Sequence, residues 1–219
     1  MHRNVVIVCN GDFPRTEYPR YLLREADFII VCDGALSKYL RNMKAVFSKE
    51  RLPDLVIGDM DSLSKSMQEK YKDLIVKVEE QDYNDQTKAF RWVMENLGEA
   101  SLIRIVAATG QREDHTIGNM SLLMEYTRMF DLKDRIVEMV TDHGTVFAAT
   151  DTFEMECGTG RKVSIFSPDN SLKIKSSGLQ WQTGKVVFDN WWKATLNRAV
   201  DDKVRLEFSH KSLALIMLD

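Results

Sequence analysis

Apolar and polar positions alternate in two different ways along the chain. In the first two-thirds, β-rich apolar runs predict strands at residues 4–9, 28–32, 54–57, 74–78 and 101–109. The segments between and after them space apolar residues at helical intervals, and they predict helices near residues 17–26, 34–43, 62–71, 85–98 and 114–130. Such alternation of strands and helices is typical of a parallel sheet covered by helices.

After about Asp142 the pattern changes to short β-rich runs separated by turn residues. These runs predict strands at residues 145–150, 151–156, 162–167, 171–176, 185–188, 204–209 and 212–218. No long helical pattern remains in this part. We therefore expect an α/β fold class, with an N-terminal parallel-sheet α/β domain over residues 1–145 and a small antiparallel β-sandwich domain over residues 146–219.

Composition narrows the class of protein. Hydrophobic residues make up 44% of the 219 residues, but no apolar run approaches the roughly 20 residues that a membrane-spanning helix needs. Charges of both signs are interspersed and the net charge is −3, which disfavours a nucleic-acid partner.

The cysteines, Cys9, Cys32 and Cys157, are far apart, so we expect free core thiols. The strand pattern starts at once and leaves no room for a signal peptide, so we expect a cytoplasmic protein with no membrane partner.

Polar residues gather directly after each predicted strand of the first part. They form the segments 10–12, 33–34, 58–62, 81–85 and 109–115, and they include several aspartates. Because the carboxyl ends of parallel strands meet at one edge of a sheet, we expect these segments to lie together. Crowded carboxylates suit Mg²⁺, and Lys88 and Arg112 could hold phosphate oxygens. The pattern leaves phosphatase, nucleotidyl transferase and kinase chemistry open, although a single aspartate after a strand is usually a turn residue or helix cap.

Three motifs in this order resemble the thiamine pyrophosphokinase family: PDLVIGDMDSL at 53–63, EQDYNDQTKAF at 80–90 and ATGQREDHTIGNMSLL at 108–123. The segments GTGRKVSIFSPD and SSGLQW of the second part are similar to the β-rich domain of that family. The resemblance implies an enzyme that transfers diphosphate from ATP to the hydroxyl of thiamine, releases AMP and requires Mg²⁺. It also implies a homodimer in which thiamine lies between the α/β domain of one subunit and the β domain of the other.

The resemblance assigns roles residue by residue. The acidic catalytic cluster would be Asp33, Asp59, Asp61 and Asp85, and the metal ligands among them would be Asp59, Asp61 and Asp85. ATP would be bound by Asn10, Gly11, Gly34, Ser62, Lys88, Gly110, Arg112, Asp114 and Asn119. Thiamine would be bound by Gln81, Trp181, Asp189 and Asn190.

Several alternatives stay open. Many family members carry a Ser-Asn pair near the C-terminus, and its best match here is Asp189-Asn190. Trp191 and Trp192 are as consistent with a subunit or domain interface as with stacking on thiamine. Asp33, Asp61 and Asp85 are all candidates for the general base. Other functions to be tested are diphosphate transfer to another heterocyclic alcohol, such as a pterin, and nucleotide sensing without turnover.

Overall fold

The computed structural model describes residues 3–219, and the chain divides into two compact units. The first unit runs as far as Leu122 and takes in Leu132–Asp142, and the second contains Leu123–Asp131 and His143–Asp219. The domain bounds 1–145 and 146–219 expected from the sequence, and the nucleotide-binding and thiamine-binding roles of the two domains, stay predictions.

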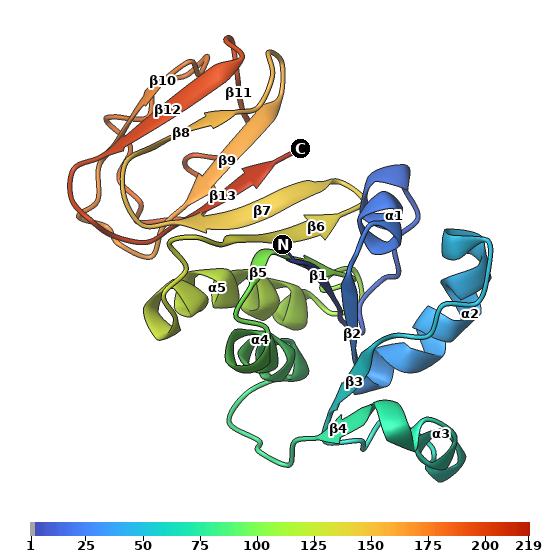
Figure 1. Cartoon of the computed structure of the whole chain (residues 1–219). Coiled ribbons are helices and arrows are strands. Elements are labelled where there is room, and N and C mark those ends of the chain that lie inside the picture. Colours follow the sequence, from blue (N-terminus) through green and yellow to red (C-terminus); the bar gives the residue numbers. More distant parts are fainter. Residues whose placement is uncertain (1–2) are drawn as a thin grey trace. The chain divides into compact units, whose positions relative to one another are not determined.

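The first unit contains a parallel sheet with strand order β6-β5-β1-β2-β3-β4. Its strands are β1 (Arg3–Val8), β2 (Phe28–Cys32), β3 (Leu55–Gly58), β4 (Ile75–Lys77), β5 (Ala100–Val106) and β6 (Ile136–Thr141) (Figure 1). The strand β6 was not predicted from the sequence. Chain order runs from β1 through β2 and β3 to β4, and it then returns to β5 on the other side of β1. The switch point of the sheet therefore lies between β1 and β5, where open α/β sheets bind ligands.

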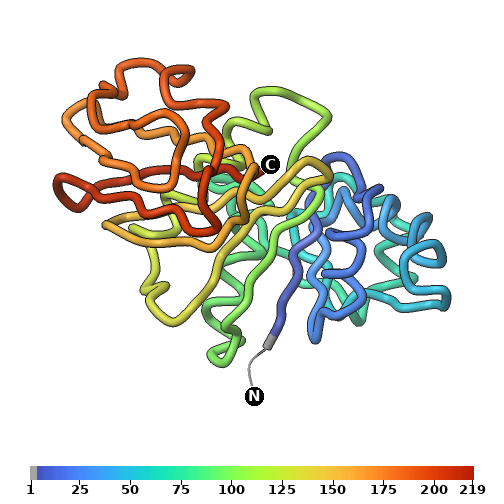
Figure 2. The backbone as a smooth tube through the Cα atoms, turned by 90° about the horizontal axis from the view of Figure 1, so that it is seen from above, coloured from blue at the N-terminus to red at the C-terminus, as the bar shows by residue number. Residues whose placement is uncertain are grey.

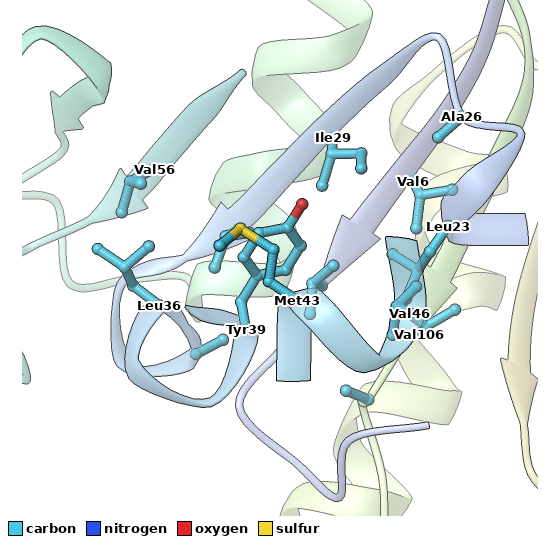
Figure 3. Close-up of a cluster of buried hydrophobic side chains, with 14 of the residues drawn as sticks. Val6, Leu23, Ala26, Ile29, Leu36, Tyr39, Met43, Val46, Val56 and Val106 are labelled. Carbon is cyan, nitrogen blue, oxygen red and sulfur yellow. The ribbon is translucent and has the colours of Figure 1, made fainter. Parts of the chain in front are cut away.

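Helices cover both faces of this sheet. The helical elements are α1 (Glu17–Arg24), η1 (Asp33–Ala35), α2 (Leu36–Phe47), α3 (Lys65–Lys70), η2 (Lys72–Leu74), α4 (Asp85–Asn96) and α5 (Glu113–Met129). Val6 and Val8 of β1 pack in one cluster with Leu23 of α1 and Tyr39 of α2 (Figure 3). The intervening residues of β1 are also fully buried and point to the opposite face, and α4 contacts β1, β2 and β3. The strands read as unbroken apolar runs because both of their faces are covered.

The second unit is built from antiparallel strands. They are β7 (Gly144–Ala149), β8 (Phe153–Glu156), β9 (Lys162–Phe166), β10 (Ile174–Ser177), β11 (Asn197–Arg198), β12 (Lys203–Phe208) and β13 (Ala214–Leu218) (Figure 1). The path of the chain through this unit runs from yellow to red in Figure 2. One group has the order β11-β9-β13-β7 and the other β10-β12-β8. Their inward residues, among them Val163, Ile174 and Leu206, form one core. This confirms the expected fold class of a parallel α/β part followed by a small antiparallel part.

Some local expectations were wrong, and others were confirmed. The expected strand at 185–188 is irregular: the N–H of Val186 closes a turn onto the carbonyl of Thr183, and Phe188 alone is deeply buried. A run of four residues is too short for its apolar content to distinguish a strand from a loop anchored in the core.

Cys9, Cys32 and Cys157 are free and buried, as expected, and all three lie in the described chain. Among the described residues, no helix is long and apolar enough to cross a membrane.

Candidate active site

The loops that follow β1 and β5 are hydrogen-bonded to each other at the switch point of the sheet. The N–H of Gly11 donates to the carbonyl of Ala107 at 2.6 Å, and the N–H of Asp12 donates to the carbonyl of Thr109 at 2.8 Å. A Cβ at position 11 would collide with the carbonyl oxygen of Thr109, so the close approach of the two loops requires glycine there. The sequence pattern thus places the backbone of both loops at the point where ligands bind in this class of sheet.

A polar pocket of about 250 Å³ opens at these loops. It is lined by Asn10, Gly11, Ala108, Thr109, Gln111, Arg112, His115, Thr116 and Asn119. The first turn of α5 contributes to this wall, and the N-terminus of a helix carries a partial positive charge that favours anions. The structure therefore brings Asn10, Gly11, Arg112 and Asn119 of the predicted ATP-binding set together.

Arg112 is engaged with a neighbouring acid. Its guanidinium lies 2.5 Å from the Asp114 carboxylate, and both side chains are about two-thirds exposed, at 66% and 63%. The hydrogen bond from Arg112 lowers the pKa of Asp114 below its ordinary value. Gly110 lies beside the same loops with φ +96°, and a Cβ there would lie 2.7 Å from Oδ2 of Asp12. A phosphate that used Arg112 would have to share the guanidinium with Asp114 or displace it.

A cluster of carboxylates lies at the ends of β2 and β3 and at the start of α4. Asp33 is buried with 1% of its surface exposed, and one of its carboxylate oxygens accepts the N–H of Gly34. Its other oxygen, Oδ2, is buried and has no hydrogen-bond partner among the described residues. Burial, and then the charges of Asp85 and Asp59, raise the pKa of Asp33 to about 6. Asp85 and Asp59 are therefore close enough to Asp33 to repel its carboxylate.

Asp59 is stabilised as a carboxylate by its neighbours. The N–H of Asp61 donates to its Oδ1 at 3.0 Å, and Nε2 of Gln81 donates to its Oδ2 at 3.1 Å. These two hydrogen bonds lower the pKa of Asp59. On α4, the buried Nζ of Lys88 lies 3.4 Å from Oδ1 of Asp85. The structure thus places Gln81 and Lys88 at the carboxylates.

Gly34, Gly58 and Ser62 complete the walls of this cluster. A Cβ at Gly58 would lie 2.9 Å from the Asp33 side chain, and one at Gly34 would lie 3.4 Å from Cβ of Ser62. The side chain of Asp61 is exposed, so the structure brings Asp61 to the cluster through its backbone. Small residues at these positions keep the chain close around Asp33.

The donor set fits a hard divalent cation. Positive charge would satisfy the unpartnered buried carboxylate oxygen of Asp33 and would relieve the repulsion of Asp33 by Asp85 and Asp59. Within residues 3–219, however, no group of three or more His, Cys, Asp or Glu side chains is already arranged to hold a metal ion. Side chains at this edge would therefore have to turn towards a bound cation.

Sequence reasoning missed two residues of this edge. Nζ of Lys38, one turn into α2, donates to the carbonyls of Asn10 and Gly11 at 2.7 and 3.0 Å, and burial lowers its pKa. Asn84 caps α4 by accepting the N–H of Thr87 and donates to Asn119 at 2.8 Å. An asparagine directly before a predicted helix is a typical cap, which was the one available signal for Asn84.

The predicted acceptor residues of the second unit lie on irregular segments. Trp181 is 56% exposed, so it is not part of the core. Its backbone exchanges two hydrogen bonds with the buried Asn197 side chain, at 3.1 and 2.6 Å. Asp189 instead lies 2.5 Å from Lys193, and the side chain of Asn190 is exposed. Asn197, which sequence reasoning missed, is thus the amide that the structure places at Trp181.

Trp191 and Trp192 are exposed by 56% and 68%. The ring of Trp191 meets that of Phe166 edge-on, at 6.4 Å between centroids, and a large part of its surface remains open. Leu196 and Val200 are exposed on the same stretch of chain. The second unit therefore exposes four large apolar side chains on this stretch, Trp191, Trp192, Leu196 and Val200.

Comparisons with known proteins agree over both units. The family model "Thiamin pyrophosphokinase, catalytic domain" matches residues 19–134, and "Thiamin pyrophosphokinase, substrate-binding domain" matches residues 144–215. Thiamine pyrophosphokinase 1 of Arabidopsis thaliana is 28% identical over 200 residues, which are 82% of this chain and 72% of that protein. Thiamin pyrophosphokinase 1 of Caenorhabditis elegans is 23% identical over 211 residues, which are 90% of this chain and 82% of that protein.

Solved structures show the same fold. A crystal structure of thiamine pyrophosphokinase from Bacillus subtilis superimposes with a TM-score of 0.75 at 16% identity, covering 98% of both chains. The crystal structure of yeast thiamin pyrophosphokinase gives a TM-score of 0.76 at 16% identity, covering 98% of this chain and 86% of the other.

Proposed function

The chain belongs to the thiamin pyrophosphokinase family, and we propose that it transfers the diphosphate group of ATP to the hydroxyl of thiamine. The products are thiamine diphosphate and AMP. The observation that carries this proposal is the cluster of Asp33, Asp59 and Asp85 at the sheet edge that also holds the polar pocket. Transfer of phosphoryl groups depends mainly on positioning and on neutralising charge, and this edge offers groups for both.

ATP would bind along the carboxyl edge of the sheet. The backbone of Gly11 and Gly110 and the start of α5 would face the phosphates, and Arg112 would leave Asp114 to bind a phosphate oxygen. Asn10, Gly34, Ser62, Lys88, Asp114 and Asn119 would complete this site. Lys38 supports it from behind by holding the carbonyls of Asn10 and Gly11.

Asp59, Asp61 and Asp85 would hold Mg²⁺, which when bound supplies positive charge to the phosphate oxygens. The protein's own residues prepare this site. Gln81 and the N–H of Asp61 keep the Asp59 carboxylate ionised, and Lys88 holds Asp85. The exposed Asp61 side chain is free to turn towards the cluster.

The transfer itself would be an in-line displacement. The oxygen of the thiamine hydroxyl forms a bond to the β-phosphorus of ATP, the bond from that phosphorus to the oxygen of the α-phosphate breaks, and AMP leaves with that oxygen. The hydroxyl proton passes to a carboxylate. Of the candidates Asp33, Asp61 and Asp85, we favour Asp33, because its buried Oδ2 has no hydrogen-bond partner among the described residues and is available to accept a proton.

Thiamine would be bound by Gln81 and by residues of the second unit, with Trp181 as an aromatic face for its cationic thiazolium ring. Asp189 and Asn190 are further candidates for the same pocket, and Asn197 joins them because it fixes the Trp181 backbone. We further propose a homodimer whose active site is shared between subunits. The exposed Trp191, Trp192 and Leu196 support it, because association would remove this apolar surface from water.

The dimer has a direct test. Light scattering on the purified chain should give a mass of about 50 kDa, twice the 25.2 kDa of one chain. A monomer mass at micromolar concentration in a fully active sample would contradict the shared site.

One assay tests the reaction. The protein is incubated with ATP and Mg²⁺ in the presence of thiamine, of a hydroxymethyl pterin or of no acceptor, and AMP is measured. AMP that forms only in the sample with thiamine supports the proposal. AMP that forms only in the sample with the pterin would show that the acceptor is another heterocyclic alcohol. ATP binding without AMP under every condition would instead favour a nucleotide sensor.

A further inference from the structure

We propose that Asn84 is a positioning residue that couples the carboxylate cluster to the nucleotide pocket; this inference rests on the function proposed above. Its side chain is bonded to helix α4 on one side and to Asn119 of helix α5 on the other. Asp85 of the carboxylate cluster is the next residue along the chain, and Asn119 is part of the pocket wall. A single amide group therefore joins the two halves of the site.

The orientation of this amide chain is fixed at both ends. The carbonyl of Ala108 can only accept a hydrogen bond, so the group facing it at 2.8 Å must be Nδ2 of Asn119. Oδ1 of Asn119 then faces Asn84 and accepts from Nδ2 of Asn84 at 2.8 Å. This leaves Oδ1 of Asn84 to accept the N–H of Thr87 at 3.1 Å, which is the capping bond of α4. Neither amide can flip without placing two donors or two acceptors together.

Position 84 must therefore both accept and donate, in two directions. Serine and aspartate cap a helix about as well as asparagine, because capping needs an acceptor oxygen. A serine hydroxyl is too short to reach Asn119 as well, and an aspartate has no donor. The requirement for asparagine thus comes from the link to α5 and not from the cap.

A second bond ties the same two helices together. Nε2 of the buried Gln86 donates to the backbone carbonyl of Asn119 at 3.1 Å. Asp85, the first residue of α4, lies between these two anchored positions, and its charge acts on the buried Asp33. A ligand that orders Asn119 in the pocket therefore also fixes the start of α4. We expect ATP and Mg²⁺ to strengthen each other's binding through this link.

The test compares Asn84→Ser, which keeps the cap, with Asn84→Ala, which removes both bonds. Ser64→Ala is the matched control, because Ser64 caps α3 by accepting the N–H of Met67 at 3.3 Å. Melting temperature and AMP formation are measured for each variant. Calorimetry measures the Kd of ATP in the presence and in the absence of Mg²⁺, and this measurement needs no turnover. The ratio of the Kd without Mg²⁺ to the Kd with Mg²⁺ is the Mg²⁺ factor.

We expect Asn84→Ser to melt within about 2 °C of the wild type, with kcat lowered about tenfold and the Mg²⁺ factor lowered about fivefold. Ser64→Ala should lower the melting temperature and leave kcat and the Mg²⁺ factor unchanged. Wild-type kcat and Mg²⁺ factor in Asn84→Ser would overturn the inference. So would a melting temperature for Asn84→Ser as low as that of Asn84→Ala, because the residue would then only support the helix.

The two proposals fail in different ways. If the wild type forms no AMP from ATP and thiamine, the proposed function fails, and the Mg²⁺ factor of Asn84→Ser still judges the coupling. If the wild type is active and Asn84→Ser behaves like it in both measurements, only the coupling fails.

Discussion

The carboxylate cluster of the first unit and the tryptophan segment of the second unit were both assigned from sequence motifs, yet they are built differently. Asp33, Asp59 and Asp85 are held at the ends of β2 and β3 and at the first residue of α4. Trp181 and Asp189 lie on irregular chain between β10 and β11, and both are exposed. Regular elements thus fix the acidic residues, whereas turns and single side-chain contacts fix the others.

The difference also appears in how polar groups are satisfied. Asp33 is buried, repelled by its neighbours and short of one hydrogen-bond partner among the described residues. Asp189 is already paired with Lys193. A site for a charged ligand keeps groups unsatisfied until the ligand arrives, so the first region has the stronger signature of function. Substitutions in the carboxylate cluster should therefore cost the most activity, and a substitution at Asp189 should cost the least.

Asp59→Asn should abolish turnover while leaving the fold intact, and Asp61→Asn should do the same. Loss of a metal ligand removes several kcal/mol of transition-state stabilisation, so we expect kcat/KM to fall at least about 10³-fold. Steady-state AMP formation measures the effect, and circular dichroism checks the fold. The control is Asp82→Asn, an exposed aspartate of the loop between β4 and α4. Near-normal turnover in both variants would remove the metal assignment from this edge.

Trp181→Ala should raise the KM for thiamine while the KM for ATP stays nearly constant. An aromatic face over a desolvated cation contributes about 2 kcal/mol, which corresponds to a change of about 30-fold. Because Trp181 is 56% exposed, the variant should stay folded. The control is Trp92→Ala, since Trp92 stacks on Phe28 at 5.6 Å and should affect stability instead. Equal changes in both KM values would place the acceptor pocket elsewhere.

Asp33→Asn should stabilise the metal-free protein at neutral pH. Burial and Asp85 raise the pKa of Asp33 from 3.8 to about 6, so the folded chain binds this proton more tightly than the unfolded chain. Stability is therefore lost as pH rises from about 4 to about 6 and stays lower above that range. An uncharged asparagine avoids this loss, and we expect a gain of about 2 kcal/mol in unfolding free energy at pH 7.5 that vanishes near pH 4.

Chemical denaturation in EDTA at several pH values measures the gain. Asp169 of the second unit supplies the opposite case, because hydrogen bonds from Ser171, Ser212 and His210 lower its pKa. Asp169→Asn should destabilise the chain at neutral pH, and the difference should shrink as the pH falls. A loss of stability in Asp33→Asn at pH 7.5 would show that the carboxylate is not strained.

Asp189→Ala should have the smallest effect, with the KM for thiamine raised by no more than about threefold. Its carboxylate is bound to Lys193 at 2.5 Å and is available to a ligand only when that pair opens. Kinetics of Lys193→Ala, measured in parallel, show whether Asp189 contacts thiamine or only pairs with Lys193. If Asp189 serves thiamine, freeing it in Lys193→Ala lowers the KM, and an unchanged KM in both variants would exclude Asp189 from the pocket.

Local sequence patterns were enough to predict the class of fold and the edge of the sheet at which the carboxylates gather. Apolar runs such as 28–32 are local patterns, and burial of both faces makes them readable without knowledge of their neighbours. Since parallel strands end at one edge, the position of Asp33 and of Asp59 followed from the strand assignment alone. The strand β11 has only two residues, Asn197 and Arg198, and their sequence carries no strand pattern. The parallel strand β6 was overlooked, although its sequence IVEMVT is a β-rich run of the kind that predicted the other strands.

Which side chains meet, in contrast, follows from the tertiary structure and not from local sequence patterns. Asn84 with Asn119 and Trp181 with Asn197 are pairs separated by 35 and 16 positions, and no periodicity links their members. Asp189 matches an acceptor motif in the sequence and pairs in the structure with Lys193, only four positions away, in a turn where no helical pattern predicts that contact. Contacts of this kind depend on how loops close and on which polar groups remain unsatisfied once the core is packed, and the order of residues along the chain does not contain that information in a local form.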